Sequence, residues 1–123
     1  MDKYQALHTF WSGFDVPAYD QSSVPKDATF PRLTYSVSTS DIVSGPVSMT
    51  ASLWYYGESW ADISRKTDQI ASQIGMGGTV CLYDNGALWV KRGSNFSQRM
   101  SDPEDINIRR VVLQIEAEFL SAN

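Results

Sequence analysis

The chain contains very little cysteine and histidine. Cys81 and His8 are the only residues of these two types among 123 residues. An internal disulfide needs two cysteines, and structural zinc sites need several cysteines and histidines, so the sequence excludes both. It gives no support for a Cys–His or Ser–His catalytic pair, and we interpret Cys81 as a small core residue and His8 as a surface residue. We therefore expect no catalytic residue, no metal, no cofactor and no enzyme activity.

Positive charge is not in excess, and long apolar runs are missing as well. Ten Lys and Arg residues are outnumbered by fourteen Asp and Glu residues, which gives a net charge of −4. A protein that binds duplex DNA tightly through its phosphates carries the opposite imbalance. No stretch approaches the roughly 20 apolar residues that span a membrane. We expect a cytoplasmic protein that neither binds DNA tightly nor enters a membrane.

The composition is that of one ordered globular domain, residues 1–123. Apolar residues make up 42% of the chain, aromatic residues 12% and charged residues 20%. A chain of this length buries about two-thirds of the surface that its unfolded form exposes, which is enough for a single core.

Two segments have the three- and four-residue apolar spacing of helices. The first, ended by Gly13, has Tyr4, Leu7, Trp11 and Phe14 on one face. The second has Trp60, Ile63, Thr67, Ile70 and Ile74 on one face. Ser59 and Asp62 form a capping box at its start, and the glycines of 75–78 end it.

Strands are expected where apolar and polar residues alternate, at 16–20, 32–38, 47–56, 79–84, 87–92 and 111–119. A helix is the alternative for 111–119, but strict alternation and β-branched residues favour the strand there. Asn85-Gly86 predicts a type I′ hairpin turn. Segments 21–31 and 93–105 are interpreted as long surface loops. The fold class is α+β: a mixed, mainly antiparallel sheet of about six strands, flanked by two helices.

Both faces of the expected 79–92 hairpin are apolar. Cys81, Tyr83, Leu88 and Val90 share one face, and Val80, Leu82 and Trp89 share the other with Lys91. One face packs on the core, and the second, with Trp54 and Tyr56 adjacent, must be covered by a helix of this chain or by another subunit.

Other candidate sites have simpler interpretations. Glu116 and Glu118 share a strand face about 7 Å apart, which suits carboxylate chemistry but is far commoner on a solvated or salt-bridging face. The glycine-rich 75–78 segment follows a helix and precedes a strand, the reverse of the order found in phosphate-binding loops.

The run FPRLTYSVSTSDIVSGPVSMTASLWYYGESWADISRKTDQIASQIG, followed by GALWVKRG, resembles the small tail terminator or tail-completion proteins of siphophages, especially those of Gram-positive hosts. The shared features are a Phe-Pro strand entry, the strand 51–55, the helix start Ser59-Trp60 and its end Ile74-Gly75. They are packing and capping features, so the resemblance is carried by the whole pattern.

The resemblance implies a structural virion protein that assembles in the host cytoplasm as a hexameric ring at the head-proximal end of the tail tube. The ring would stop tube elongation and attach the head or neck, with the two long loops contacting these partners. DNA would pass through an acidic lumen without specific binding. The residues expected at the subunit or tail interface are Trp54, Tyr56, Trp89, Lys91, Arg92, Phe96, Glu116 and Glu118.

Two alternatives stay open at this stage. A head-completion or neck protein, such as a stopper or connector, would share the size and the ring symmetry and differ in its binding partner. A small ligand-binding domain or enzyme would instead require a deep polar pocket.

Overall fold

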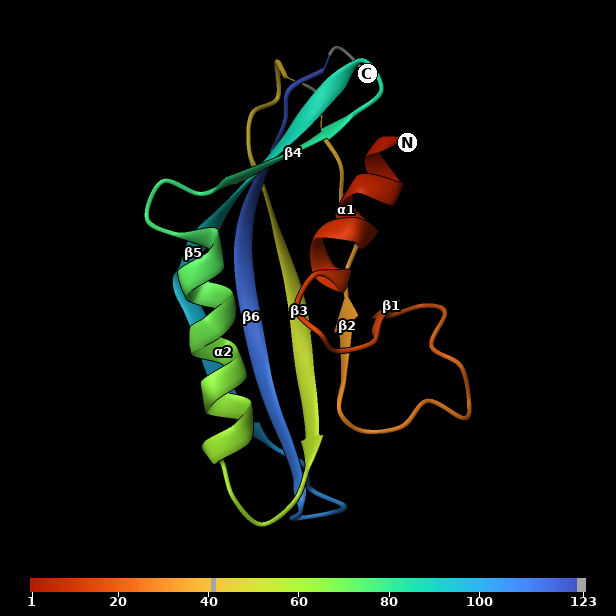
Figure 1. The fold of residues 1–123 in the computed structure, drawn as a ribbon, viewed down its shortest axis with the longest axis vertical. Coiled ribbons are helices and arrows are strands. Elements are labelled where there is room, and N and C mark those ends of the chain that lie inside the picture. The colour runs from red at the N-terminus through yellow and green to blue at the C-terminus, as the bar shows by residue number, and fades with distance from the viewer. Residues whose placement is uncertain (41, 122–123) are drawn as a thin grey trace.

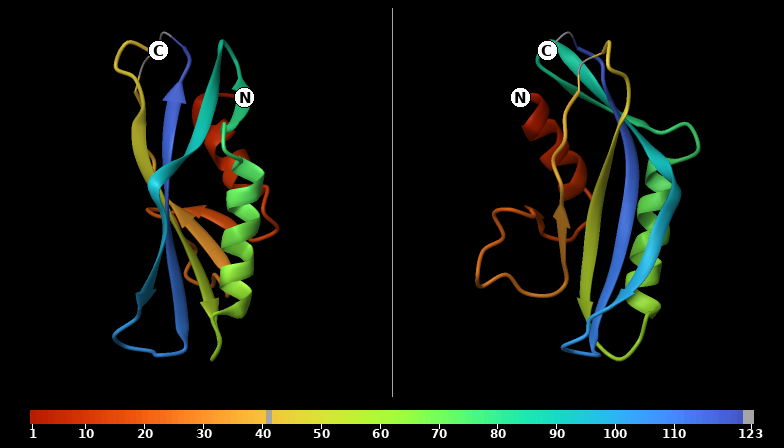
Figure 2. Two further views of the ribbon diagram at one scale, coloured as in Figure 1. Left: turned by 90° about the vertical axis from the view of Figure 1, so that its left-hand side faces the viewer. Right: turned by 180° about the vertical axis from the view of Figure 1, so that it is seen from behind.

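The computed structural model describes residues 1–40 and 42–121 as one curved six-stranded sheet with two helices on the same face (Figure 1; Figure 2). The elements in chain order are α1 (Lys3–Ser12), β1 (Ala18–Asp20), β2 (Arg32–Tyr35), β3 (Val47–Tyr56), α2 (Ala61–Ile74), β4 (Thr79–Tyr83), β5 (Gly86–Ser101) and β6 (Ile108–Phe119). This is the predicted α+β class, with the sheet curled into a half-barrel.

The sheet has the strand order β1-β2-β3-β6-β5-β4. β1 runs parallel to β2, and every other neighbouring pair is antiparallel. β3 and β6 form the centre of the sheet, with a continuous register from Val47 opposite Ala117 to Tyr56 opposite Ile108. We call the end of the sheet at the β4–β5 turn the hairpin end, and the end at the β5–β6 turn the turn end.

Strict alternation along β6 separates the two faces of the sheet. Val111, Leu113, Ile115, Ala117 and Phe119 are buried, whereas the residues between them are only partly buried. Period two is the pattern of a strand with one face on the core. The buried side, which we call the inner face, lies under both helices, and the opposite side is the outer face (Figure 2).

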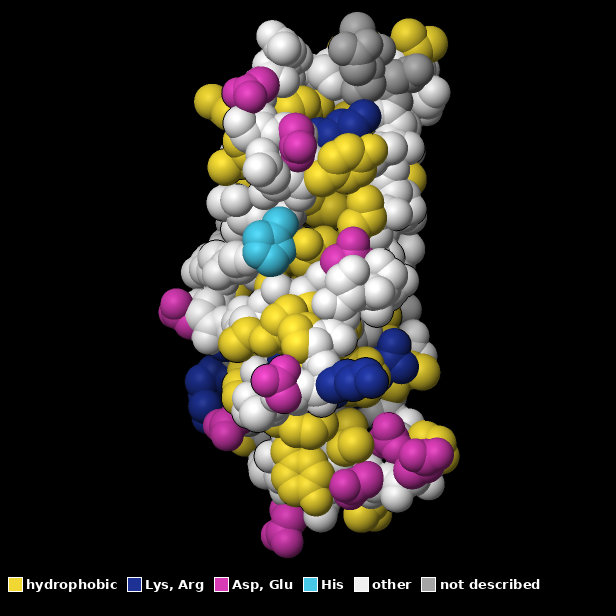
Figure 3. All heavy atoms as spheres, turned by 90° about the vertical axis from the view of Figure 1, so that its right-hand side faces the viewer, with side chains coloured by type: hydrophobic (Ala, Val, Ile, Leu, Met, Phe, Trp, Pro, Cys, Tyr) yellow, Lys and Arg dark blue, Asp and Glu magenta, His cyan; other side chains and the backbone are white. Residues whose placement is uncertain are grey.

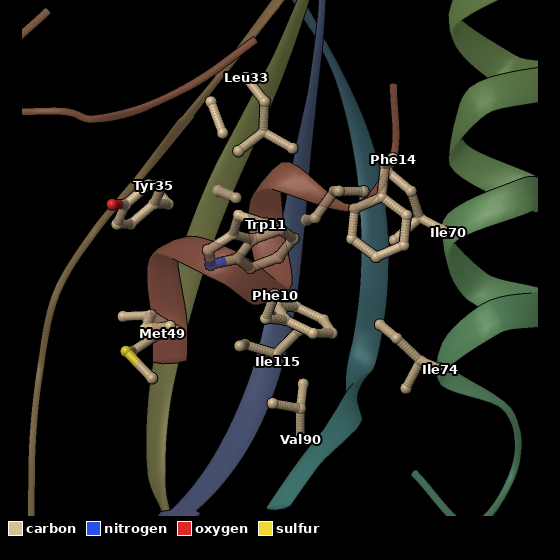
Figure 4. Close-up of a cluster of buried hydrophobic side chains, with 14 of the residues drawn as sticks. Phe10, Trp11, Phe14, Leu33, Tyr35, Met49, Ile70, Ile74, Val90 and Ile115 are labelled. Atoms are coloured by element: carbon tan, nitrogen blue, oxygen red, sulfur yellow. The ribbon is translucent and has the colours of Figure 1, made fainter. Parts of the chain in front are cut away.

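Helix α1 supplies the aromatic centre of the core. Phe10, Trp11 and Phe14 pack edge to face or tilted, with Phe10 and Trp11 ring centroids 4.8 Å apart, between the sheet and α2 (Figure 4). The helix ends at Gly13 as predicted. The predicted face was wrong at Tyr4, which is 52% exposed.

Helix α2 buries the expected stripe of Ile63, Thr67, Ile70 and Ile74 and ends before Gly75. The predicted capping box was correct in part: the Ser59 hydroxyl accepts a hydrogen bond from the Ala61 N–H at 3.0 Å, but the N-cap is Trp60, which makes no side-chain cap hydrogen bond. Asp62 instead pairs with Arg65 of the next turn at 2.9 Å, which draws its carboxylate away from the helix start.

The β4–β5 hairpin forms where predicted, but its turn lies one residue earlier. Tyr83 pairs with Gly86, so the connecting residues are Asp84 and Asn85. Asn85 takes the positive φ of 65°, and Gly86 begins the next strand. Because Asp84 is not among the residues with positive φ, the turn is not the predicted type I′.

Segment 93–105 was predicted as a loop, and this was wrong over most of its length, because β5 continues to Ser101. The register shifts between Arg92, opposite Ile115, and Ser97, opposite Leu113. Four residues of β5 therefore lie opposite Gln114 alone, in an enlarged β-bulge. The bulge breaks the alternation on which the sequence-based strand prediction relied. Segment 21–31, in contrast, does lack helix and strand.

A single buried cluster joins both helices to all six strands except β4, whose Cys81 and Tyr83 pack against it from its margin. Among the described residues, no helix has the length and apolar character needed to cross a membrane.

Candidate functional site

In the described part of the chain, no helix covers the outer face of the sheet, which holds most of the residues predicted from the sequence to form an interface (Figure 2). Five of these residues lie on the outer face because each alternates with the core residues of its strand: Trp54, Trp89, Lys91, Glu116 and Glu118. The structure thus gathers these side chains on one surface, but it divides them between two ends.

Near the turn end, Trp54 is flanked by two arginines from the neighbouring strands. Arg32 on β2 and Arg110 on β6 both lie opposite Trp54 in the strand register. Their guanidinium carbons lie 5.7 and 4.6 Å from the centroid of the Trp54 ring, within cation–π range. The indole N–H of Trp54 donates to Thr34 Oγ1 at 2.9 Å, which fixes the ring across the sheet. We call Arg32, Trp54 and Arg110 the Trp54 surface.

At the hairpin end, Trp89 and Lys91 form a second group. The Lys91 ammonium lies 4.0 Å from the Trp89 ring centroid and 3.3 Å from Glu118 Oε1. The indole N–H of Trp89 donates to the Gly77 carbonyl at 3.0 Å. Trp54 and Trp89 face β6 residues eight positions apart, about 26 Å along the strand. The expected adjacency of Trp54 to the hairpin was therefore wrong.

The charge partners of this group lie within the chain itself. Glu118 pairs with Lys91, and Glu116 accepts a hydrogen bond from the Ser48 hydroxyl at 2.8 Å. The two carboxylates share a face, as predicted, but each is held by a neighbour from an adjacent strand. This is the salt-bridging and hydrogen-bonded face that their sequence position indicates.

Of the other three predicted interface residues, one lies on the outer face and two do not. Tyr56 is on the outer face beyond Trp54, with its ring centroid 5.6 Å from that of Phe30. Arg92 lies opposite Ile115 in the register, so it belongs to the inner face, but its side chain is exposed. Phe96 lies in the β5 bulge, partly buried against the core, so it is a packing residue within this chain.

The β4 edge of the sheet exposes apolar side chains. β4 is hydrogen-bonded to β5 on one side, and in the described part of the chain no strand pairs with its other side. On its outer face Val80 is 55% exposed and Leu82 is 76% exposed. Both were predicted to share a face with Trp89 and Lys91, and the register confirms this. This chain therefore leaves the second apolar face of the hairpin uncovered.

His8 is the residue most suggestive of enzyme chemistry, but its surroundings are open. Its Nδ1 atom contacts the Tyr35 hydroxyl at 2.8 Å, and its Nε2 atom lies 3.3 Å from the Ser12 hydroxyl. The histidine lies on the surface of α1 (Figure 3) and lines a shallow hollow of about 640 Å³ that Ser12 does not line. Burial, and to a lesser extent the charge of Asp20, raises the pKa of Tyr35, which keeps its hydroxyl protonated.

Cys81, interpreted from the sequence as a small core residue, lies at the margin of the core. It lies half-buried on β4, and desolvation raises the pKa of its thiol, which disfavours the nucleophilic thiolate. Within residues 1–40 and 42–121, no group of three or more His, Cys, Asp or Glu side chains is placed to hold a metal ion.

Sequence reasoning missed the two arginines of the Trp54 surface. Neighbouring residues on a strand point to opposite faces, so the pair Arg109-Arg110 predicts from sequence alone that one of the two arginines faces outward. The register that places Arg110 and Arg32 beside the same indole could not be predicted, because it depends on the pairing of three strands that are distant in sequence.

Comparisons of this chain with protein-family models, with curated proteins and with solved structures find no match.

Proposed function

We propose that the chain is a structural subunit of a siphophage tail, a tail terminator. In this proposal it assembles as a ring on the head-proximal end of the tail tube, stops tube elongation and provides the attachment surface for the head or neck. The sequence pattern that resembles this family spans most of the chain, and the α+β sheet with helices on one face is the fold that the resemblance implies.

The observation that carries the proposal is the uncovered β4 edge. A long, exposed apolar edge strand is a template for pairing with another chain, and monomeric proteins usually protect such edges with charges, prolines or bulges. Residues 79–83 contain none of these, and Val80 and Leu82 project into solvent beside the unpaired backbone. A ring of identical subunits would cover this edge with a neighbouring copy, through a heterologous contact that closes on itself.

The mildly acidic net charge fits the same role. Fourteen acidic residues against ten basic ones give the chain a charge of the same sign as DNA. Like charge along a lumen opposes phosphate binding, which would let DNA pass through the ring without adhering.

Negative-stain microscopy of the purified protein, with and without isolated tail tubes of the same phage, tests ring formation and partner together. We expect rings, and we expect them to cap one end of each tube. Rings that bind the portal or connector but leave the tubes uncapped would replace the terminator with a neck protein. Particles that form no rings and bind no tubes would refute both.

A matched pair of variants tests the β4 edge itself. Leu82→Lys places a charge on the edge without disturbing the core, and we expect it to abolish rings while the subunit stays folded. Ile106→Lys is the control, because Ile106 is 80% exposed in the turn before β6, at the opposite end of the sheet. Equal ring formation by both variants would assign the contact to another surface.

A further inference from the structure

Four of the six arginines contact two tryptophans near the turn end of the sheet. Arg32 and Arg110 lie on Trp54 on the outer face, and Arg99 and Arg109 lie on Trp60 on the helix side. Trp60 immediately precedes α2, at the end of the loop that follows β3. The two pairs differ in how many of their guanidinium donors are used.

The Trp60 pair is used within the fold. Arg109 donates from Nε to the Gly57 carbonyl at 3.0 Å and from an Nη atom to the Glu58 carbonyl at 2.8 Å. Arg99 donates to the Ser64 hydroxyl at 3.0 Å. These bonds tie β6 and β5 to the loop before α2 and to its first turn, which is a structural role.

The Trp54 pair keeps most of its donors free for a partner. Arg110 makes one hydrogen bond, from Nε to the Ser52 hydroxyl at 3.1 Å, and Arg32 makes one long bond of 3.4 Å to the Ala28 carbonyl. A guanidinium carries five N–H donors in a planar fork that matches a carboxylate. Stacking and the single bond to Ser52 hold the Arg110 fork in position at little further entropy cost on binding.

Among the residues that the structure describes, neither arginine of the Trp54 surface has an anionic partner. The ion pairs among the described residues join the N-terminus to Asp84, Arg65 to Asp62, and Lys91 to Glu118. Arg32 lies 4.4 Å from the Phe30 ring centroid and 5.7 Å from that of Trp54, and Arg110 lies 4.6 Å from that of Trp54. With no carboxylate paired to either among the described residues, these two half-buried guanidinium groups form an unbalanced positive site. Such a site favours an anion supplied from outside.

We propose that the Trp54 surface binds a carboxylate-bearing segment of a partner protein. Arg32 and Arg110 each take a carboxylate of the segment through the guanidinium fork, and Trp54 and the exposed Tyr56 ring beside it supply the apolar contact between them. Arginine and aromatic side chains together are the residue types that dominate protein interfaces. The surface lies far from the β4 edge, so this proposal stands or falls independently of ring formation.

The surroundings of the surface favour a protein carboxylate over nucleic acid. The turn that joins β5 to β6 carries Asp102, Glu104 and Asp105, and Figure 3 shows acidic side chains gathered at this end of the molecule. A polyphosphate chain that reached Arg110 would enter the field of these acids, whereas a segment with one or two carboxylates can avoid it.

Fluorescence anisotropy at low ionic strength, with a labelled oligoglutamate peptide of only two glutamate residues as the probe, tests the proposal. We expect the wild-type protein to bind the peptide, and we expect the double variant Arg32→Gln/Arg110→Gln to bind at least about tenfold more weakly. The control is the double variant Arg65→Gln/Arg92→Gln, which removes the same two charges at positions outside the Trp54 surface and should bind like the wild type. A labelled oligothymidylate of equal charge is measured in parallel.

A measurement on the wild-type protein locates the site even where the double variant fails to fold. The indole N–H resonance of Trp54, assigned by its loss in Trp54→Phe, should shift on addition of oligoglutamate, while that of the buried Trp11 should not. Unchanged affinity in the double variant, no shift at Trp54, no binding by the wild type, or tighter binding of oligothymidylate than of oligoglutamate would each overturn the proposal.

Discussion

Arg109 and Arg110 are neighbours in sequence with different predicted roles, and replacing each by glutamine separates them. Arg109→Gln removes two hydrogen bonds to the loop carbonyls of Gly57 and Glu58 and one stacking contact with Trp60. Arg110→Gln removes one hydrogen bond to a hydroxyl and one stacking contact.

The expected costs follow from these contacts. Hydrogen bonds from a charged donor contribute about 1.5–3 kcal/mol each, and a partly exposed cation–π contact contributes about 0.5–1 kcal/mol. Since Arg109 is only half-buried, solvent screening lowers the sum, and we expect Arg109→Gln to reduce the free energy of unfolding by about 2 kcal/mol. Arg110→Gln should cost less than about 1 kcal/mol.

Urea denaturation followed by circular dichroism measures both values, provided that the slope of the free energy against denaturant is unchanged. The Arg109→Gln variant should also melt about 8 °C below the wild type. Arg110→Gln should melt near the wild type and yet lose affinity for oligoglutamate. Equal destabilisation by the two substitutions would refute the division into a structural and a binding arginine.

Further predictions concern the backbone and the titrating groups. Gly78→Ala should lower the free energy of unfolding by at least about 1–2 kcal/mol, measured by thermal melts, because Gly78 has a φ of +83° and a Cβ there would lie 2.5 Å from a β5 carbonyl oxygen. Gly77→Ala is the control, because a Cβ at Gly77 meets open space and should leave the stability unchanged. Because burial raises the pKa of the Cys81 thiol, it should react with a thiol reagent more slowly than a peptide cysteine at pH 8. The midpoint of its reaction rate against pH should lie at higher pH than that of a free cysteine, and an equal midpoint would contradict this. The backbone N–H and the hydroxyl of Ser22 donate to Asp20 and lower the pKa of its carboxyl, so the stability that this carboxylate contributes is lost as pH falls through the lowered pKa. Ser22→Ala should move the NMR titration midpoint of Asp20 up toward that of an ordinary aspartate. An unchanged midpoint would contradict the assigned cause.

The sequence predicted the central elements well because their side chains alternate or repeat strictly. β3 and β6 are buried on one face, and Ile63, Ile70 and Ile74 lie on one stripe of α2, so periodicity alone located them. The short strand β1 was placed approximately, as Val16–Asp20 against the observed Ala18–Asp20.

Errors arose where a local rule competed with tertiary contacts. The glycine of Asn85-Gly86 was assigned to the turn, but pairing with Tyr83 takes it into β5. Asp62 was assigned to a cap, but Arg65 one turn later binds it. In each case the residue had two possible partners, and sequence spacing does not rank them.

The candidate site was predicted only in part. Trp54, Trp89 and Lys91 were recognised as surface residues because they stand at outward positions of apolar strands. Their separation into two groups depends on which part of β6 each neighbouring strand pairs with, and no local sequence pattern predicts this register. That Arg32 and Arg110 have no ion pair among the described residues likewise depends on where the fold places every other charge.

The bulge in β5 divides that strand into two segments whose registers are set separately. Residues 88–92 pair with one half of β6 and residues 97–101 with the other, while 93–96 lie opposite Gln114 alone. A residue inserted in a regular part of β5 would turn every following side chain to the wrong face. A residue inserted between Ser94 and Asn95 would instead be absorbed, so this is the position in the sheet where chain length can vary without loss of register.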